Sequence, residues 1–417
     1  MATSSSAVQI GGARLRFADI TAPIGTDEFL SRYWTREGVL LRFAERDFGR
    51  FLNWDAVNAI LNAGDFTFPG IKVSRRDSPV PPEQFTTNAG GRQVVDSRAV
   101  VDCFRDGASF GITGADSHWP PLREVLDCFH DALLESVNAN VYCSPANTQG
   151  FQCHYDLHEV FVLQIEGTKH WRVFRPFTEA PVEGWTREGA EEALQTEPYI
   201  DVVLRKGDVL YVPRGHWHFA VAEDSVSLHV TVGVSCRRGL QFLDWLGTEL
   251  LQETVWRKNA PLLRSEAGDG SAVRSNGTLE WSRELRESLI EKLSDATLFD
   301  RFLRDTIRGL HPLHNIDLLT QGLPEPAALD RVVFERPAGR PYLLEEQSSG
   351  EVVVSVAGLD IQIDGIKAAV LDKVFSSSSF TLADVRSWDS ELDIGEITEL
   401  LAELVRAGLL LIRPIRS

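Results

Sequence analysis

The spacing of hydrophobic positions along the chain changes twice, and the changes divide the sequence into three parts. In the first third, apolar residues recur three and four positions apart, which predicts helices over residues 27–34, 54–62 and 122–137. From about residue 138 to 235, the pattern becomes short β-branched or aromatic runs separated by Gly and Pro. Five such runs predict a compact antiparallel sandwich or barrel in this region.

Helical spacing returns after Ser235, over residues 240–256 and 279–310. The segment between them, Ser265–Asn276, is polar and rich in Gly, which predicts a loop or mobile linker. The last part reads as two strands, a helix, a second helix that begins at a capping box of Asp393 and Glu396, and a final strand after Gly408. Helices followed by strands in this order predict a small winged-helix-like module.

Composition narrows the class of protein. The 417 residues exceed what one ordinary core serves, and 43% hydrophobic with 24% charged residues is typical of globular domains. The net charge of −18, from 42 basic and 60 acidic residues, disfavours non-specific binding to nucleic acid. No run of apolar residues is long enough to span a bilayer, and the first residues lack the pattern of a signal peptide. The sequence therefore predicts a cytoplasmic protein that is not membrane-bound.

Three residues of the β-rich part have the pattern of a metal site. On a strand, His154 and Asp156 would face the same side, while Tyr155 would face the other. With His218, which follows a Pro-Arg-Gly turn, they match the two histidines and one carboxylate that bind iron in non-haem Fe(II) oxygenases. Two alternatives stand beside this interpretation. His154 and Asp156 alone are also compatible with a solvated edge strand, and His216 competes with His218, which we favour because it directly precedes the next apolar run.

Lys169 adds a second chemical feature. It begins a predicted strand between Gly167 and the aromatic residues Trp171 and Phe174, so its ammonium could point into the barrel. A buried ammonium needs an anion, and a dicarboxylate co-substrate that binds the iron at one end would supply it at the other. The alternative is a surface lysine whose stem lies on apolar neighbours.

These residues lie in strings that resemble a known family. The segments NANVYCSPANTQGFQCHYDLHEVFVLQIEGTKHWRVF, KGDVLYVPRGHWHFA and SLHVTV are similar to the Jumonji-C (JmjC) hydroxylases of the ribosomal oxygenase, or cupin-4, group. The resemblance is close over about residues 138–235 and looser in the flanking parts. It implies a mixed α+β fold, in which a double-stranded β-helix barrel of the cupin and JmjC type has flanking helices. It also implies three domains: a catalytic domain at 1–236, a helical dimerisation region at 237–335 and a winged-helix-like domain at 336–417.

The resemblance also implies a cofactor set and roles for single residues. The group uses Fe(II), the co-substrate 2-oxoglutarate and O2. His154, Asp156 and His218 match its iron ligands, and Lys169 matches the lysine that pairs with the distal carboxylate of 2-oxoglutarate. Four more residues match positions that line the co-substrate pocket: Asn140, Tyr142, His229 and Thr231. The chain departs from the group at Leu157-His158, where many relatives have a second acidic residue, and at Gly233, where some have a hydroxyl side chain.

The function implied is hydroxylation of an unactivated C–H bond in a side chain of a protein or peptide, either a ribosomal protein or a biosynthetic peptide. The expected partners are that substrate and a second copy of the chain in a homodimer, with no membrane or nucleic acid. Two rivals remain. A small-molecule cupin oxygenase would have no reason to bury Lys169, and a non-enzymatic winged-helix regulator is disfavoured because acidic residues outnumber basic ones from Ile366 to Ser417. The pattern also leaves open whether iron, zinc or manganese occupies the site in the cell.

Overall fold

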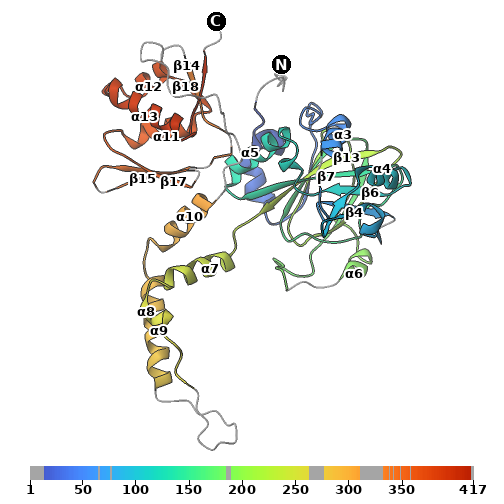
Figure 1. Ribbon diagram of the computed structural model, residues 1–417, viewed down its shortest axis with the longest axis horizontal. Helices are drawn as coiled ribbons and strands as arrows, with labels where there is room; N and C mark the ends of the chain where they lie inside the picture. The colour runs from blue at the N-terminus through green and yellow to red at the C-terminus, as the bar shows by residue number, and fades with distance from the viewer. Residues whose placement is uncertain are drawn as a thin grey trace, which may run out of the picture. The chain divides into compact units, whose positions relative to one another are not determined.

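The computed structural model describes residues 14–63, 66–75, 78–184, 189–262, 277–309, 332–337, 339–340, 342–347, 349–356 and 358–414 (Figure 1). Contacts between residues divide the chain into two compact units. Among the described residues, the first unit takes in those up to Cys236 and a short later segment at 336–340. The second takes in the rest. The predicted linker Ser265–Asn276 lies outside the described residues.

The first unit is built on two facing sheets. The larger has eight strands in the order β1-β11-β8-β13-β7-β6-β2-β3, and the smaller has three in the order β10-β9-β12. A separate hairpin pairs β4 with β5. The bounds of these strands are β1 Val39–Leu41, β2 Ile71–Arg75, β3 Ser78–Pro79, β4 Thr86–Ala89, β5 Arg92–Val95, β6 Ser109–Ile112, β7 Ser136–Ser144, β8 Glu159–Glu166, β9 Lys169–Phe174, β10 Ile200–Leu204, β11 Val209–Val212, β12 Trp217–Ala222 and β13 Ser227–Ser235.

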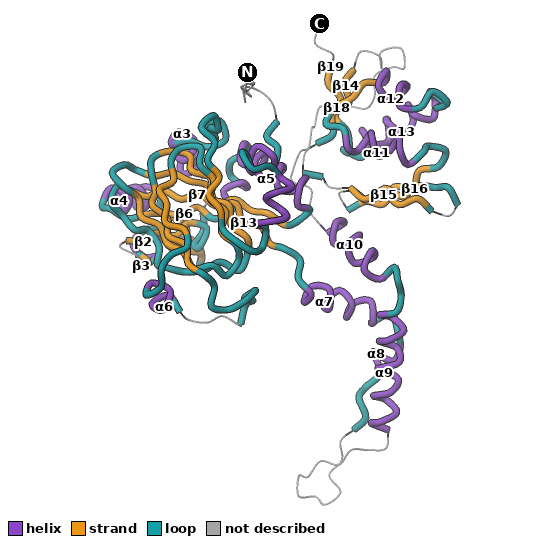
Figure 2. Tube along the Cα trace, turned by 180° about the vertical axis from the view of Figure 1, so that it is seen from behind, coloured by secondary structure: helices purple, strands orange, loops and turns teal. Residues whose placement is uncertain are grey.

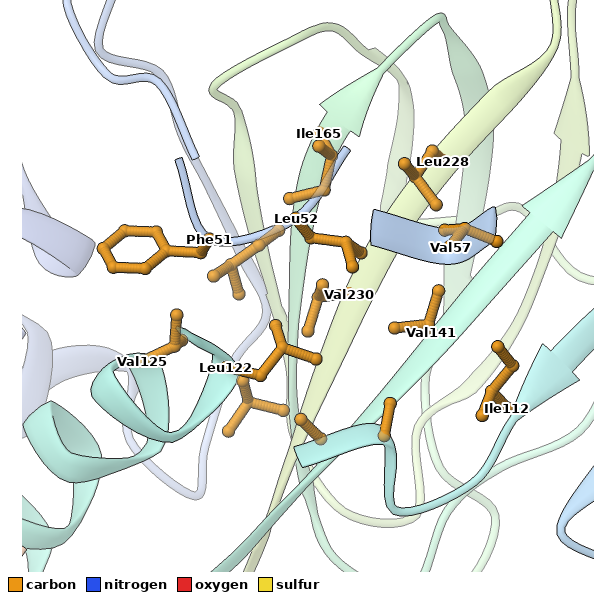
Figure 3. Close-up of a cluster of buried hydrophobic side chains, with 14 of the residues drawn as sticks. Phe51, Leu52, Val57, Ile112, Leu122, Val125, Val141, Ile165, Leu228 and Val230 are labelled. Carbon is orange, nitrogen blue, oxygen red and sulfur yellow. The ribbon is translucent and has the colours of Figure 1, made fainter. Parts of the chain in front are cut away.

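Alternation along β7, β8 and β13 separates a hydrophobic core from the interior of the barrel. Successive side chains of a strand face opposite sides of its sheet, so every second residue joins the core on the helical side. The strand residues in that core include Ala139, Val141, Cys143, Phe161, Leu163, Ile165, Leu228, Val230, Val232 and Val234. Figure 3 shows Val141 and Val230 near Leu122 of a helix, with Leu228 near Val57. The residues between them, among them Tyr142 and His229, are left for the barrel interior.

The first unit also contains helices and short helical turns. Their bounds are α1 Phe17–Thr21, α2 Thr26–Glu28, η1 Phe29–Tyr33, α3 Trp54–Ala63, η2 Pro82–Gln84, α4 Ser97–Arg105, η3 Ala115–Ser117, α5 Pro121–Leu133 and α6 Ala190–Leu194. Helix α5 buries Leu122, Val125, Leu126 and Phe129 against the sheet, in the register that the sequence pattern predicts.

The structure corrects the predicted elements of the first third in two ways. The helix expected to reach Val137 ends at Leu133, because Leu134 adopts a left-handed conformation with φ of 54° and β7 begins two residues later. The region is also not purely helical, since β1, β2, β3 and β6 contribute four strands to the larger sheet. These strands are too short for their alternation to stand out in the sequence.

The barrel contains more strands than the five runs that were predicted. The run YIDVVLRKGDVLYVP forms two strands, β10 and β11, because Gly207 makes a turn with φ of 85° between them. The residues after the Pro-Arg-Gly turn form β12, which pairs with β9 in the smaller sheet.

The second unit begins with four helices: α7 Gly239–Leu250, α8 Thr254–Arg257, α9 Gly277–Leu293 and α10 Leu298–Gly309. Figure 2 follows them along the chain. Each of the two long helices predicted here is therefore two helices. Asp295 separates α9 from α10, since its carboxylate accepts the backbone N–H of Thr297 at 2.9 Å. Leu246, Leu250 and Leu298 form a small buried cluster.

The remainder of the second unit has its own core of apolar residues. Its elements are β14 Val332–Glu335, β15 Tyr342–Glu346, β16 Val352–Val356, β17 Leu359–Ile363, α11 Ala368–Ser376, β18 Ser379–Thr381, α12 Leu382–Trp388, α13 Ile394–Arg406 and β19 Leu411–Pro414. One sheet has the order β18-β14-β19, and the other is the meander β15-β16-β17. Asp393 caps α13 as predicted, through the backbone N–H groups of Gly395 and Glu396. None of the helices in the described part of the chain has the length and apolar character needed to cross a membrane.

Candidate metal and co-substrate site

His154, Asp156 and His218 lie together at one end of the smaller sheet. His154 and His218 form an antiparallel bridge in which each backbone N–H donates to the other's carbonyl, at 3.1 and 2.7 Å. Their ring centroids are 4.5 Å apart. One ligand atom from each of the three side chains lies within 4.8 Å of the others. The structure therefore brings together the three residues that the sequence pattern had grouped.

Backbone carbonyls fix the orientation of both imidazoles. His154 Nδ1 lies 2.7 Å from the carbonyl oxygen of Gln152, and His218 Nδ1 lies 3.0 Å from that of His216. A carbonyl oxygen only accepts, so each Nδ1 carries the hydrogen and each Nε2 keeps its lone pair. Neutral imidazoles with a free Nε2 are the form in which histidine binds a metal ion.

Electrostatics keep this group in the protonation state that a metal needs. Desolvation alone would raise the pKa of Asp156, but the neighbouring imidazoles of His218 and His154 outweigh it and lower the pKa. Burial, together with the nearby His154, lowers the pKa of His218 to about 4. At neutral pH the group therefore presents the Asp156 carboxylate and a neutral His218 imidazole.

His216, the alternative to His218, lies apart from this group. Its Nδ1 is 2.6 Å from the hydroxyl of Tyr199, which also accepts the backbone N–H of Gly38 at 3.1 Å. The Tyr199 hydroxyl therefore donates to His216. Burial lowers the pKa of His216 to about 4. The hydrogen bond between Tyr199 and His216 therefore links the start of β10 to the turn before β12.

Lys169 is buried at the first position of β9, with 3% of its surface exposed. Its ammonium donates to the hydroxyl of Ser144 at 3.0 Å, and within the described ranges it has no carboxylate at ion-pair distance. Burial lowers the pKa of Lys169 to about 8. Such an ammonium favours an anionic ligand, because the ligand would replace the solvation that burial removed.

The other predicted pocket residues lie on the barrel side of β7 and β13. Tyr142 pairs with His229 across these strands, and their rings stack at 5.0 Å with 12° between the planes. Burial raises the pKa of Tyr142 and lowers the pKa of His229. Asn140 pairs with Thr231 one step along, and its side-chain oxygen accepts the backbone N–H of Gly114 at 3.0 Å.

Two buried polar atoms beside these residues lack a protein partner within the described part of the chain: His229 Nδ1 and Trp171 Nε1. The Trp171 ring lies 5.6 Å from that of His229 and 5.9 Å from that of His218. Buried polar groups are rarely left unpaired in a folded protein, so these two atoms are available to a polar ligand.

One cavity of about 600 Å³ connects these features. Its wall includes every residue that was predicted for the metal and the co-substrate: Asn140, Tyr142, His154, Asp156, Lys169, His218, His229 and Thr231. A cavity of this size accommodates a small dicarboxylate beside part of a larger substrate.

Some residues of the site were not predicted. Ser144, the hydrogen-bond partner of Lys169, could have been found, since it continues the period-two series of Asn140 and Tyr142 on β7. Three residues of the cavity wall carried no such signal, because they lie between residues 62 and 122, where no element was predicted: Phe68, Lys72 and Phe85.

The two departures from the resembled family lie side by side. A Cβ atom on Gly233 would come within 3.0 Å of His158 Cε1 and 2.6 Å of the side-chain oxygen of Asn138. The imidazole of His158 therefore occupies the space that a side chain at position 233 would need. His158 Nε2 is also 4.0 Å from Asp156 Oδ1.

Two nitrogens and one carboxylate oxygen on one side of a metal ion form the donor set of non-haem Fe(II) oxygenases, which leaves coordination positions open for a co-substrate. The buried ammonium in the same cavity fits an anionic end of that co-substrate. The residues present therefore fit an Fe(II) ion and a dicarboxylate.

Comparisons with known proteins agree with this geometry. Residues 118–241 match the JmjC domain family. The bifunctional lysine-specific demethylase and histidyl-hydroxylase NO66 of Drosophila persimilis is 30% identical over 304 residues, which is 70% of this chain and 41% of that protein. Ribosomal oxygenase 1 of Gallus gallus is 34% identical over 221 residues, which is 52% of this chain and 36% of that protein. The chain spans less than half the length of these curated relatives.

Solved structures show a similar fold over nearly the whole chain. YcfD, a ribosomal oxygenase from Escherichia coli in complex with cobalt and 2-oxoglutarate, aligns over 93% of this chain and 98% of that chain, with a TM-score of 0.55 and 17% identity. A second structure of E. coli YcfD gives a TM-score of 0.59 at 18% identity. The predicted JmjC and cupin barrel with mixed helices and sheets is thus confirmed.

Proposed function

Because residues 118–241 form a JmjC domain and the chain is related to the ribosomal oxygenases, we propose that it is an Fe(II)- and 2-oxoglutarate-dependent oxygenase. Its activity would be the hydroxylation of an unactivated C–H bond in a side chain of a protein or peptide. His154, Asp156 and His218 would hold the iron. Lys169, with Tyr142, Asn140, His229 and Thr231 around it, would bind 2-oxoglutarate.

One observation carries this proposal: a buried ammonium, which has no carboxylate partner among the described residues, shares a cavity with a preformed two-histidine, one-carboxylate group. A structural lysine would be expected at the surface or in an ion pair, since burying an unpaired charge destabilises the fold. The distal carboxylate of 2-oxoglutarate would pair with the ammonium and offset this destabilisation. That arrangement distinguishes the proposal from a small-molecule cupin oxygenase that uses no 2-oxoglutarate.

When bound, iron with 2-oxoglutarate and O2 supplies an oxidant that converts C–H to C–OH and releases succinate and CO2. The protein's residues prepare the site. The carbonyls of Gln152 and His216 hold His154 and His218 with Nε2 available. Lys169 neutralises the co-substrate and Ser144 orients the ammonium. The apolar residues of the wall exclude water, which strengthens these interactions.

A protein or peptide substrate agrees with the relatives' names, which include a histidyl-hydroxylase and ribosomal oxygenases. The net charge of −18 would attract basic segments, such as those of ribosomal proteins, and would repel nucleic acid. We also propose that the protein is cytoplasmic.

We further propose that the second unit has two roles, matching a helical dimerisation region at 237–335 and a winged-helix-like domain at 336–417. Apolar residues are exposed on α7, α9 and α10, which favours a homodimer interface. They are Leu240, Leu243, Leu279, Ile290, Leu293 and Phe299. The arrangement of α11, α12 and α13 with the sheet β18-β14-β19 supports the winged-helix-like assignment. A role as a winged-helix regulator without enzymatic activity would leave the buried Lys169 unexplained.

The test is succinate formation from 2-oxoglutarate by protein loaded with Fe(II) without air and then exposed to O2. Wild type should form succinate, His154→Ala should form none, and Lys169→Ala should need much more 2-oxoglutarate. Lys206→Ala is the matched control, because Lys206 is exposed and pairs with Asp47. Absence of both succinate formation and metal-dependent binding of 2-oxoglutarate in wild type would refute the proposal.

A further inference from the structure

A second lysine, Lys72, lines the cavity and has no part in the chemistry proposed above. It lies on β2, where it pairs with Gly111 of β6, and Gly111 in turn pairs with Tyr142 of β7. Tyr142 pairs with His229, so Lys72 belongs to the same cross-strand row as the two stacked rings. Residues of one row face the same side of a sheet, which places Lys72 on the cavity side.

The glycine between them leaves Lys72 access to the cavity. A Cβ atom at Gly111 would come within 2.9 Å of Tyr142 Cε1, so the tyrosine ring covers the position where a side chain would stand. No side chain at position 111 therefore separates Lys72 from the interior. Lys72 itself is exposed, as expected of a residue at an open mouth.

Lys72 has no ion-pair partner among the described residues, although its charge acts on Asp156 and helps to lower the pKa of that carboxyl. Among the described residues of the wall, Asp156 is the single carboxylate, and it belongs to the metal group. Lys72 makes no ion pair with a described carboxylate. Lys169 would be neutralised by the co-substrate, so the remaining charge at the mouth is positive.

The wall on this side also includes a group of apolar residues. Phe68 and Phe85 lie with ring centroids 6.3 Å apart, and Phe151 packs edge-on to Tyr142 at 5.4 Å. Pro79, Val80 and Pro82 complete this side. A guanidinium or ammonium that enters here would lose part of its water and meet the like charge of Lys72 at the mouth.

We propose that Lys72 determines specificity by excluding cationic side chains, so that the residue modified by this enzyme is uncharged. The inference rests on the proposed function and narrows its substrate class. This inference is compatible with the acidic surface of the protein. Salt screens the field of a surface charge within about 8 Å at physiological ionic strength, so the acidic residues act on the substrate segment at the surface and not on the side chain inside the cavity. Basic flanking residues would be attracted, whereas the one side chain that enters the cavity must be neutral.

The first test uses a digest of purified ribosomal proteins made with a Glu-specific endoproteinase, which leaves Arg and Lys inside the peptides. Peptides that gain one oxygen atom are mapped by mass spectrometry, and the yield is normalised to the succinate that each variant forms. Wild type should modify uncharged residues. Lys72→Glu should increase modification of Arg and Lys relative to uncharged residues by at least about tenfold, with Lys72→Met in between. Lys206→Glu makes the same charge change away from the cavity and should behave as wild type.

The second test needs no turnover. Protein loaded with Co(II) and the inert co-substrate analogue N-oxalylglycine is titrated with propylguanidinium, and binding is followed by tryptophan fluorescence. Lys72→Glu should bind this cation at least about tenfold more tightly than wild type and Lys206→Glu.

Four results would overturn the inference. Wild type could modify Arg or Lys as readily as uncharged residues, or Lys72→Glu could show unchanged selectivity. Wild type and Lys72→Glu could bind propylguanidinium equally, or both could form succinate with no peptide modified. The last would mean that the cavity does not select among peptide side chains. A wild-type protein that forms no succinate would instead refute the proposed function, and the titration would still test Lys72.

Discussion

At the scale of single residues, Lys169 is the position where stability and function are most clearly opposed. Its ammonium is buried, and its one hydrogen-bond partner given by the structure is the Ser144 hydroxyl. Lys169→Met keeps the length of the side chain and removes the charge. Because a charge-assisted contact to a carboxylate contributes roughly 1.5–3 kcal/mol, the dissociation constant of 2-oxoglutarate should rise about 10- to 100-fold. Calorimetric titration of Co(II)-loaded protein measures this, and an unchanged constant would exclude Lys169 from co-substrate binding.

The same residue predicts a pH dependence of stability. Burial lowers the pKa of Lys169 from 10.5 to about 8 in the folded protein. Between these two values the unfolded chain holds more protons than the folded one, so the free energy of unfolding rises with pH. Below pH 8 both states are protonated and the destabilisation is present in full. Relative to Lys169→Met, wild type should gain at most about 3 kcal/mol from pH 8 to 10.5 in denaturant titrations. The same change in the free energy of unfolding with pH in both proteins would contradict this prediction.

Neighbouring histidines with different roles give a further test. His218 Nε2 faces Asp156 Oδ2 at 3.5 Å, whereas His216 is bonded to Tyr199. His218→Ala should weaken Co(II) binding at least about 100-fold because one of three ligands is lost. His216→Asn keeps an acceptor for the Tyr199 hydroxyl and should change Co(II) affinity little. Loss of Co(II) binding in His216→Asn with retention in His218→Ala would reverse the assignment.

The residues that could be predicted from the sequence share one property. His154 with Asp156, and Asn140 with Tyr142, are two positions apart on one strand, so local alternation is enough to group them. Lys72 reaches the cavity only because β2 pairs with β6 and β6 with β7. That pairing depends on contacts between distant parts of the chain, and no local pattern in a five-residue strand specifies it.

At the scale of elements, Gly111 shows how a strand makes room for the site. Gly111→Ala would place a Cβ atom 2.9 Å from the Tyr142 ring, which itself stacks on His229. Because close-packed interiors resist added volume, the substitution should lower the free energy of unfolding by roughly 1–3 kcal/mol and weaken 2-oxoglutarate binding. Thermal and denaturant unfolding measure the first effect, and calorimetry measures the second.

Gly247→Ala is the control for this change. Gly247 lies within α7, and a Cβ atom there would meet nothing within 4 Å. Alanine is favoured over glycine in a helix by roughly 0.5–1 kcal/mol, so this variant should be as stable as wild type or more so. If Gly111→Ala is equally harmless, the Tyr142 ring does not depend on the space above Gly111.

The elements also show where sequence patterns are informative. The long strands β7, β8 and β13 and helix α5 were predicted because many of their residues alternate or recur on one face. The same reasoning overextended α5 to Val137 and joined α9 with α10, since the end of a helix depends on single residues. Leu134 in its left-handed conformation and the cap at Asp295 are such residues.

At the scale of the whole molecule, the distribution of apolar surface separates the two units. The first unit buries a large core around the barrel, whereas α9 has no buried residue and exposes Leu279, Ile290 and Leu293. A helix that is apolar on an exposed face needs a partner, and a second copy of the chain is the partner we propose. This arrangement keeps the metal site within the first unit and the association surface within the second.

Leu243→Glu with Leu293→Glu tests this separation, since both residues are more than half exposed, at 58% and 51%. Wild type should sediment as a dimer, and the double variant as a monomer, because burying two carboxylates at an apolar interface costs several kcal/mol. Co(II) binding should be the same in both proteins, since His154, Asp156 and His218 all belong to the first unit. Glu284→Gln with Glu287→Gln alters the charge of α9 at other positions and should leave the dimer intact. A wild-type monomer across the accessible concentration range would contradict the homodimer, whereas a loss of Co(II) binding on dissociation would show that the site depends on the assembly.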